Sequence, residues 1–225
     1  NLAIDHIREN KLDRKLGVFH IDYEAQYQMT TDYVDRVLES NADILEVYRV
    51  CLPIAANCAT TMSAAYWIPW DEDKKDLWVR QLPDNSINES NHDFKWFVKG
   101  MWDYDLQVRF ASWLHKKKKA EKTCCLVGIR TQESLNRWRA IHSDKNQNKF
   151  DGEKWTLDMG HGVFNGYPIF DWKVDDVWIY NSQSGHDYNK LYDLFWMAGL
   201  TPDQMRVASP FHECGIENLK LYKVI

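Results

Sequence analysis

Apolar and polar residues follow one another along the chain in a pattern of helices separated by strands. Leu2, Ile4 and Ile7 have helical spacing, which predicts a helix from Asn1 to about Asn10. Apolar runs predict strands at 16–21, 44–50, 123–128 and 219–224, and periodic segments predict helices at about 30–40, 99–117 and 188–198. Because parallel strands need crossover connections, this order predicts an α/β fold with a doubly wound parallel sheet.

Two segments interrupt this alternation. The stretch 66–91 contains Trp-Ile-Pro-Trp and Pro-Asp-Asn-Ser sequences typical of loops, so we expect a loop-rich surface insertion there. This insertion is a candidate surface for a protein partner. Four glycines within 146–166 predict a second loop, which would lie over the edge of the sheet as a candidate lid.

The strand expected at 123–128 ends in candidate anion-binding chemistry. Gly128 and Arg130 lie where a buried strand turns into a helix, and helix starts at the carboxyl ends of parallel strands offer free N–H groups. Arg130 can hold a phosphate or sulfate through two parallel hydrogen bonds, although a surface arginine near a helix start is the alternative. Glu133 and Ser134 could cap the helix or, for Ser134, bind the anion. Arg137 lies one helical turn later and could face the same ligand.

Three further residues are candidates at other segment ends. Asp22 and Tyr23 close the strand at 16–21, and Arg206 precedes an Ala-Ser-Pro-Phe-His sequence as a second arginine for an anion. A cap for the next helix is the alternative role for Asp22. We expect the carboxyl ends of the strands at 16–21, 44–50 and 123–128 to converge on one crevice, which would bring Asp22 and Arg130 together.

Composition narrows the class of protein. The net charge of −5 disfavours broad nucleic-acid binding but leaves a local basic patch open, and the run Lys116–Lys119 is also explained by a solvated helix end. No apolar stretch approaches the about 18–20 residues of a membrane span. Five cysteines without spaced pairs favour a reduced, cytoplasmic protein. Their spacing predicts neither a zinc site nor an iron–sulfur cluster.

Three motifs together resemble the phosphoadenosine phosphosulfate reductase-like branch of the PP-loop ATP pyrophosphatases. They are Leu16-Gly-Val-Phe-His-Ile-Asp-Tyr23, Gly128-Ile-Arg-Thr-Gln-Glu-Ser134 and Pro168-Ile-Phe-Asp-Trp-Lys-Val-Asp-Asp-Val-Trp-Ile-Tyr180. The tail 205–225 resembles a subgroup labelled only as a domain of unknown function. The resemblance covers most of the chain outside about 66–120. It implies a Rossmann-like, adenine nucleotide alpha hydrolase-like fold in which Asp22 lies near the nucleoside or has a Mg²⁺-linked role.

The chain departs from this family at its N-terminus. The family's Ser-Gly-Gly-x-Asp-Ser loop, which holds the phosphates, does not occur in the sequence. We therefore expect residues 1–225 to form a single PP-loop domain that lacks its first strand and phosphate loop. On its own, such a chain would be inactive.

The resemblance implies a nucleotide-binding enzyme that uses either ATP or a sulfonucleotide such as phosphoadenosine phosphosulfate, with Mg²⁺. The first reaction is adenylyl transfer with release of pyrophosphate, and the second is reduction. Sulfonucleotide reductases carry a nucleophilic cysteine in a Glu-Cys-Gly-Leu-His tail, whereas Glu213-Cys-Gly-Ile-Glu217 lacks the final histidine. Cys214 is thus a weak candidate nucleophile, and adenylation is favoured. The alternative is a non-catalytic regulatory or partner-binding protein that retains the nucleotide fold.

Overall fold

The computed structural model describes residues 1–57, 66–142, 149–202, 204, 205 and 207. The chain divides into two compact units. The first unit comprises Asn1–Asp103 and His186–Ile225, and the second comprises Tyr104–Gly185. Neither unit contains, among its described residues, a helix long and apolar enough to cross a membrane.

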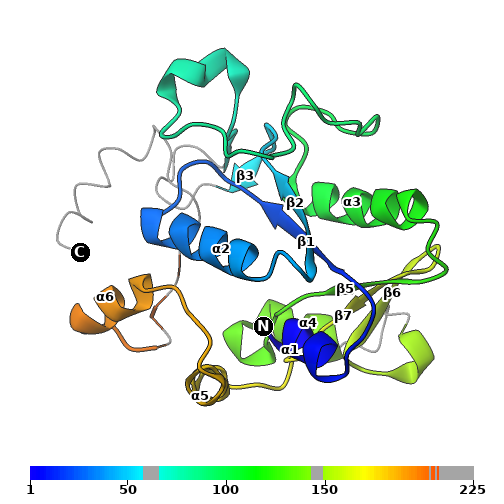
Figure 1. The fold of residues 1–225 in the computed structure, drawn as a ribbon, viewed down its shortest axis with the longest axis vertical. Helices are drawn as coiled ribbons and strands as arrows, with labels where there is room; N and C mark the ends of the chain where they lie inside the picture. Colours follow the sequence, from blue (N-terminus) through cyan, green and yellow to red (C-terminus); the bar gives the residue numbers. More distant parts are fainter. Residues whose placement is uncertain (58–65, 143–148, 203, 206, 208–225) are drawn as a thin grey trace. The chain divides into compact units, whose positions relative to one another are not determined.

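The first unit is built on two parallel strands, β1 and β2 (Figure 1). They pair from Leu16 opposite Leu45 to Ile21 opposite Val50, so both strands end at the same edge. The helices of this unit are α1 (Leu2–Glu9), α2 (Gln28–Ser40) and α6 (Leu191–Met197), and the strands are β1 (Leu16–Ile21) and β2 (Leu45–Val50). These elements confirm the predicted helix–strand–helix–strand order, with boundaries shifted by one to three residues at most of the ends.

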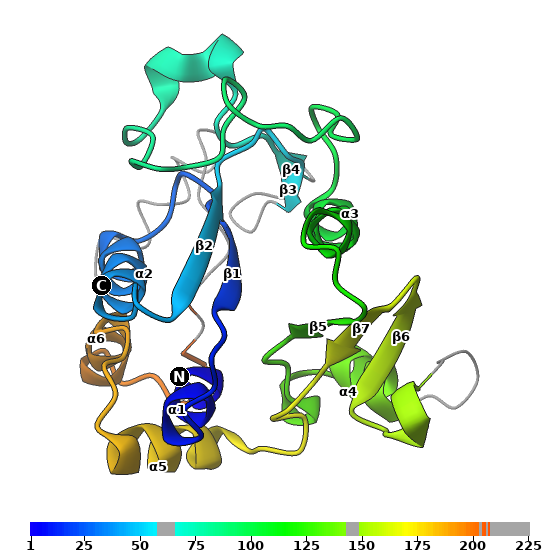
Figure 2. The same ribbon diagram turned by 45° about the vertical axis from the view of Figure 1, so that its right-hand side comes forward.

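Helix α6 packs against the start of α2 in the first unit (Figure 2). Leu191 and Phe195 of α6 form a buried cluster with Met205, against which Tyr27 and Met29 pack. The predicted helix at 188–198 is therefore present, with its apolar face inward. The final strand predicted at 219–224 lies outside the described residues.

The segment after β2 is loop-rich, as predicted, but it is not confined to the surface. It contains the two-residue strands β3 (Ala56–Asn57) and β4 (Tyr66–Trp67), which pair with each other, and the 3-10 helix η1 (Glu72–Leu77). Trp70 is only 1% exposed and Ser86 is also buried. Part of the segment predicted as a surface insertion at 66–91 is therefore buried, because a large aromatic side chain inside it gains most from leaving water.

The second unit contains a three-stranded sheet in the order β5–β7–β6 (Figure 2). Strand β7 pairs parallel with β5 and antiparallel with β6. The elements of the second unit are α3 (Asp103–Lys117), which begins at the unit boundary, β5 (Thr123–Leu126), η2 (Thr131–Glu133), α4 (Leu135–His142), η3 (Phe150–Gly152), β6 (Thr156–Gly160), β7 (Val163–Gly166) and α5 (Val174–Ser184).

This sheet corrects the loop predicted at 146–166. Gly160, His161 and Gly162 all have positive φ and make the tight turn of a β-hairpin, not a lid. Val163 beyond the turn is buried as β7 takes the central position in the sheet. Of the four glycines that suggested a loop, Gly160, Gly162 and Gly166 therefore lie in or beside the ends of β6 and β7, and Gly152 ends η3.

The α/β class with parallel strands is confirmed, with β1–β2 and β5–β7 as the parallel pairs. Strands β1 and β5 belong to different units. The convergence of their carboxyl ends on one crevice accordingly stays a prediction.

Candidate functional site

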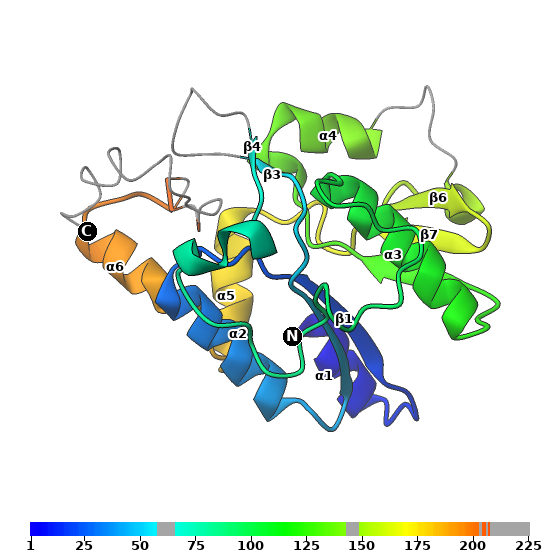
Figure 3. The same ribbon diagram turned by 90° about the horizontal axis from the view of Figure 1, so that it is seen from above.

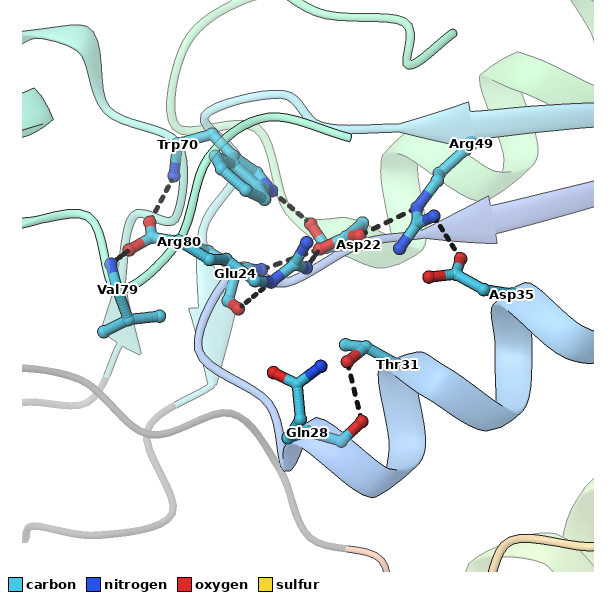
Figure 4. A network of polar contacts seen from close by, with 9 residues as sticks. All are labelled: Asp22, Glu24, Gln28, Thr31, Asp35, Arg49, Trp70, Val79 and Arg80. Carbon is cyan, nitrogen blue, oxygen red and sulfur yellow. Dashed lines mark hydrogen bonds and ion pairs between the residues drawn. The ribbon is translucent and has the colours of Figure 1, made fainter. Parts of the chain in front are cut away.

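Asp22 lies directly after β1, at the carboxyl end of the parallel pair (Figure 4). Its N–H donates to the carbonyl oxygen of Val50 at 2.9 Å, which extends the β1–β2 ladder by one residue. The side chain of Asp22 is completely buried. A carboxylate removed from water in this way needs charged or hydrogen-bonding partners on both oxygens.

Two arginines supply those partners. The Nε of Arg49 on β2 donates to one carboxylate oxygen of Asp22 at 3.0 Å, and Arg80 from the 66–91 segment pairs with the other. The N–H of Glu24 donates to the second oxygen at 3.0 Å. Arg49 also donates to Asp35 on α2 at 2.5 Å. Asp22 is thus the centre of a buried ion-pair network that joins β1, β2, α2 and the loop-rich segment.

Glu24 fixes the loop-rich segment to the same strand end. Its carboxylate accepts hydrogen bonds from the backbone N–H groups of Trp70 at 2.8 Å and Val79 at 3.2 Å. Its carbonyl oxygen accepts from Nε of Arg80 at 2.8 Å, while the indole N–H of Trp70 donates to the carbonyl oxygen of Asp22 at 2.7 Å. The Arg80 guanidinium lies 5.0 Å from the centre of the Trp70 ring. These contacts hold residues 70–80 over the carboxyl end of β1.

Burial and the charges of the network together set the pKa values of Arg49 and of two nearby side chains. Burial alone lowers the pKa of Arg49, but the carboxylates of Asp22 and Asp35 outweigh that effect and raise the pKa above its ordinary value. Burial lowers the pKa of His20, which favours its neutral form. Burial also raises the pKa of the Cys51 thiol to about 12, so Cys51 stays protonated near neutral pH.

Tyr23 points to a different partner. Its hydroxyl donates to Asp103 at 2.9 Å, and burial and that carboxylate raise its pKa above the ordinary range. Asp22, a predicted nucleoside-contact residue, has both carboxylate oxygens bonded to arginines or backbone. Arg80, which was not predicted, keeps part of its side chain exposed. A ligand at this strand end would meet Arg80 before Asp22.

The second candidate site lies at the carboxyl end of β5, in the second unit. Arg130 donates to the carboxylate of Glu133 at 3.2 Å and to the side-chain oxygen of Gln132 at 3.1 Å. Arg137 pairs with the same Glu133 carboxylate. Gln132 in turn accepts the N–H of Val174 at the start of α5, at 2.8 Å. Two guanidinium groups are therefore gathered at one strand end by a single carboxylate.

Ser134 caps helix α4 in this structure. Its hydroxyl oxygen accepts the backbone N–H of Arg137 at 3.2 Å, which is the geometry of a helix N-cap. Of the two roles considered for Ser134, capping is thus observed, and anion binding stays a prediction. The structure brings Arg130, Glu133, Ser134 and Arg137 together at this site.

Gly128 is exposed and lies between β5 and this arginine cluster. A Cβ added there would meet only Cδ1 of Ile169, at an ordinary 3.8 Å. The fold therefore does not require glycine at this position, because a Cβ would fit in ordinary van der Waals contact.

Gly128→Ala should leave the folded state intact and stabilise it by about 0.4–1 kcal/mol, because alanine loses less chain entropy on folding. If a nucleotide packs against this backbone, the same change should weaken its binding. Thermal unfolding and calorimetry on the same sample separate the two effects. A large loss of stability would show that Gly128 has a structural role.

The described part of the chain contains three cysteines, which differ in exposure. Cys51 is buried, Cys125 is partly buried with a raised pKa, and Cys124 is exposed. No group of three or more His, Cys, Asp or Glu side chains in that part could hold a metal ion. Cys214 and Arg206 lie outside the described residues.

Comparisons with known proteins identify the class to which this α/β fold belongs. The model of the phosphoadenosine phosphosulfate reductase domain family matches residues 4–196, and the chain belongs to that family. The uncharacterized protein YbdN of Escherichia coli K12 is 34% identical over 218 residues, which are 96% of this chain and 52% of YbdN. The chain thus spans about half the length of this relative.

A solved structure similar to this chain is that of a phosphoadenylyl-sulfate reductase from Candida auris, in a phosphate complex. It is 18% identical, with a TM-score of 0.40, and the match covers 85% of this chain and 70% of that one.

Sequence reasoning missed five members of the Asp22 network: Glu24, Asp35, Arg49, Trp70 and Arg80. Arg49 could have been found, because it is the cation at the end of the strand predicted beside Asp22. Arg80 could not, since it is 58 residues from Asp22 and lies in a segment with no periodic pattern.

Proposed function

We propose that this protein is a nucleotide-binding enzyme of the PP-loop type, acting on ATP or on a sulfonucleotide. The observation that carries the proposal is the arginine pair on Glu133 at the carboxyl end of β5, within the region matched by the family model. Carboxyl ends of parallel strands are where such sheets bind ligands, and guanidinium groups suit phosphate and sulfate oxygens.

Arg130 and Arg137 would bind anionic oxygens and stabilise the charge that develops during transfer. Their shared contact with Glu133 orients both guanidinium groups before a ligand arrives. Arg206 is a further candidate for the same role. Mg²⁺ would be held mainly by the phosphates of the nucleotide, as is usual for this ion, and it would neutralise phosphate charge. Asp22 and Tyr23 would then lie near the nucleoside.

Between the two reactions we favour adenylyl transfer with release of pyrophosphate. A reductase needs an accessible thiolate. Burial keeps the pKa values of Cys51 and Cys125 high. Cys124 is exposed but lies on strand β5 and is not part of a reductase tail motif. The sequence around Cys214 lacks the final histidine of that motif.

Cys214→Ser tests this preference. A serine without an adjacent base stays protonated near neutral pH, so the substitution removes any thiolate attack. We expect nucleotide-dependent activity of the full-length protein to survive. Loss of sulfite release from phosphoadenosine phosphosulfate, with unchanged folding and nucleotide binding, would instead establish reduction.

A regulatory or partner-binding protein that keeps the fold without turnover is the second candidate. Calorimetry of the full-length protein with ATP and with phosphoadenosine phosphosulfate, each with and without Mg²⁺, tests binding first. A pyrophosphate-release assay then tests turnover. Tight binding without release of pyrophosphate or sulfite would favour the regulatory protein, and absence of binding to both nucleotides would contradict the proposal.

A further inference from the structure

Positive charge is concentrated in one part of this acidic protein. The first unit contains 15 Lys and Arg against 23 Asp and Glu, whereas the second contains 13 against 10. Within the second unit, residues 104–139 hold nine cationic side chains and three acidic ones. The net charge of the whole chain therefore hides a basic region in the second unit.

The densest part of this region is the end of α3 and the turn that follows it. Five of the eight residues from His115 to Lys122 are lysines, and Glu121 is the one acidic residue among them. Lys116, Lys117, Lys118, Lys119 and Lys122 are all exposed. We name these five residues the lysine cluster.

The backbone beneath the lysine cluster is well fixed. The N–H of Ala120 donates to His115 at 3.1 Å and that of Lys119 donates to Lys116 at 3.1 Å, which closes the end of α3. The ring of His115 hydrogen bonds to Thr123 at 2.9 Å and lies against Gly162 in the β6–β7 turn. Figure 3 shows the chain turning from α3 back toward the sheet of this unit. The lysines are thus displayed from a rigid turn.

Stabilisation of the helix end explains only part of the cluster. Cations in the last turn of a helix stabilise it through the helix dipole, which accounts for Lys116 and Lys117. Lys118, Lys119 and Lys122 lie beyond the last helical residue. Lys117 and Lys122 also lie over the rings of Trp113 and Phe150, at 4.3 Å and 5.1 Å, which limits the positions of their ammonium groups.

We propose that the lysine cluster is a docking site for the phosphate backbone of a nucleic acid. Closely spaced, exposed lysines on a fixed turn match the regular spacing of phosphates, and release of the condensed counterions drives such binding. Contacts to phosphates alone carry no sequence information, so binding would be independent of sequence. This inference does not depend on the nucleotide proposed for the Arg130 site.

The test compares three variants of the full-length protein. Lys116→Gln/Lys118→Gln/Lys119→Gln removes three charges but keeps Lys117 on Trp113. The matched control, Lys11→Gln/Lys15→Gln/Lys95→Gln, removes three exposed charges from the first unit. The third variant replaces the same three cluster lysines with arginine and retains the charge.

Fluorescence anisotropy with a labelled 20-base-pair DNA, over a range of salt concentrations, measures the binding. We expect a Kd of about 1–100 µM near physiological salt, and a slope of log K against log salt of about −0.9 for each phosphate contact. The glutamine variant should bind on the order of tenfold more weakly, with its slope reduced by up to about 2.7. The control and arginine variants should match the native protein.

Unchanged DNA affinity in the glutamine variant would overturn the proposal. So would binding confined to vesicles that contain phosphatidylserine, which would assign the cluster to a membrane surface. Calorimetry with ATP keeps this result separate from the proposed function, because the lysine substitutions should leave nucleotide affinity unchanged.

Discussion

Asp22→Ala is expected to destabilise the first unit by about 3–5 kcal/mol, the largest effect of any single substitution that we predict. Removal of this carboxylate takes away the shared partner of the nearly buried Arg49 and the partly buried Arg80. It also removes the acceptor for the N–H of Glu24. Urea unfolding followed by tryptophan fluorescence measures the loss, since Trp70 and Trp78 lie in the affected segment.

Asp35→Ala is the matched control for Asp22. Asp35 pairs with the same Arg49, but its side chain is 45% exposed, so its removal should cost no more than about 1 kcal/mol. If both variants lose the same free energy of unfolding, the burial of Asp22 does not determine how much it contributes to stability. A double-mutant cycle of Asp22 with Arg80 isolates the energy that fixes the loop-rich segment to β1.

The parts of the fold that follow from local pattern could be predicted from the sequence. β1 and β2 lie within the predicted strands at 16–21 and 44–50, and their parallel direction follows from the helix between them. The position of Asp22 at a strand end followed from the same pattern. Its burial did not, because that burial depends on Arg49 from the neighbouring strand and Arg80 from a distant loop.

Strand β7 shows a second limit of local pattern. Val163–Gly166 is only four residues long and ends in glycine, so its propensity favours a loop. Pairing with β5 on one side and β6 on the other makes it a central strand. Such non-local pairing is decided by tertiary structure.

The Arg130 site depends both on local sequence pattern and on contacts between distant segments. A strand, a glycine and an arginine predicted a cation at the carboxyl end of β5, and α4 does begin at Leu135 with Ser134 as its cap. Glu133 and Arg137 are four residues apart, but Glu133 ends η2 and Ser134 is extended before α4 begins, so their contact depends on the bend between the two helices and not on the spacing of one continuous helix. The bond from Gln132 to α5 depends on a segment about 40 residues away, which the sequence did not indicate.

Arg130→Ala in the full-length protein should weaken nucleotide binding by about 1.5–3 kcal/mol, the range for a hydrogen bond to a charged group. In the structure, Nε of Arg130 donates to Glu133 and Nη1 donates to Gln132, and these bonds fix the orientation of the guanidinium. The side chain of Arg130 is 15% exposed. Arg130→Lys should recover only part of the affinity, because an ammonium group cannot form the two parallel bonds of a guanidinium.

Arg139→Ala is the control for this prediction, since Arg139 lies on α4 and is exposed. Calorimetry with ATP and with phosphoadenosine phosphosulfate measures the affinities, and thermal unfolding of the same samples measures stability. The prediction requires an affinity loss for Arg130→Ala, little change in melting temperature, and native behaviour for Arg139→Ala. Unchanged affinity with a much lower melting temperature would mean that Arg130 serves the fold through its ion pair with Glu133, and that the anion is bound elsewhere.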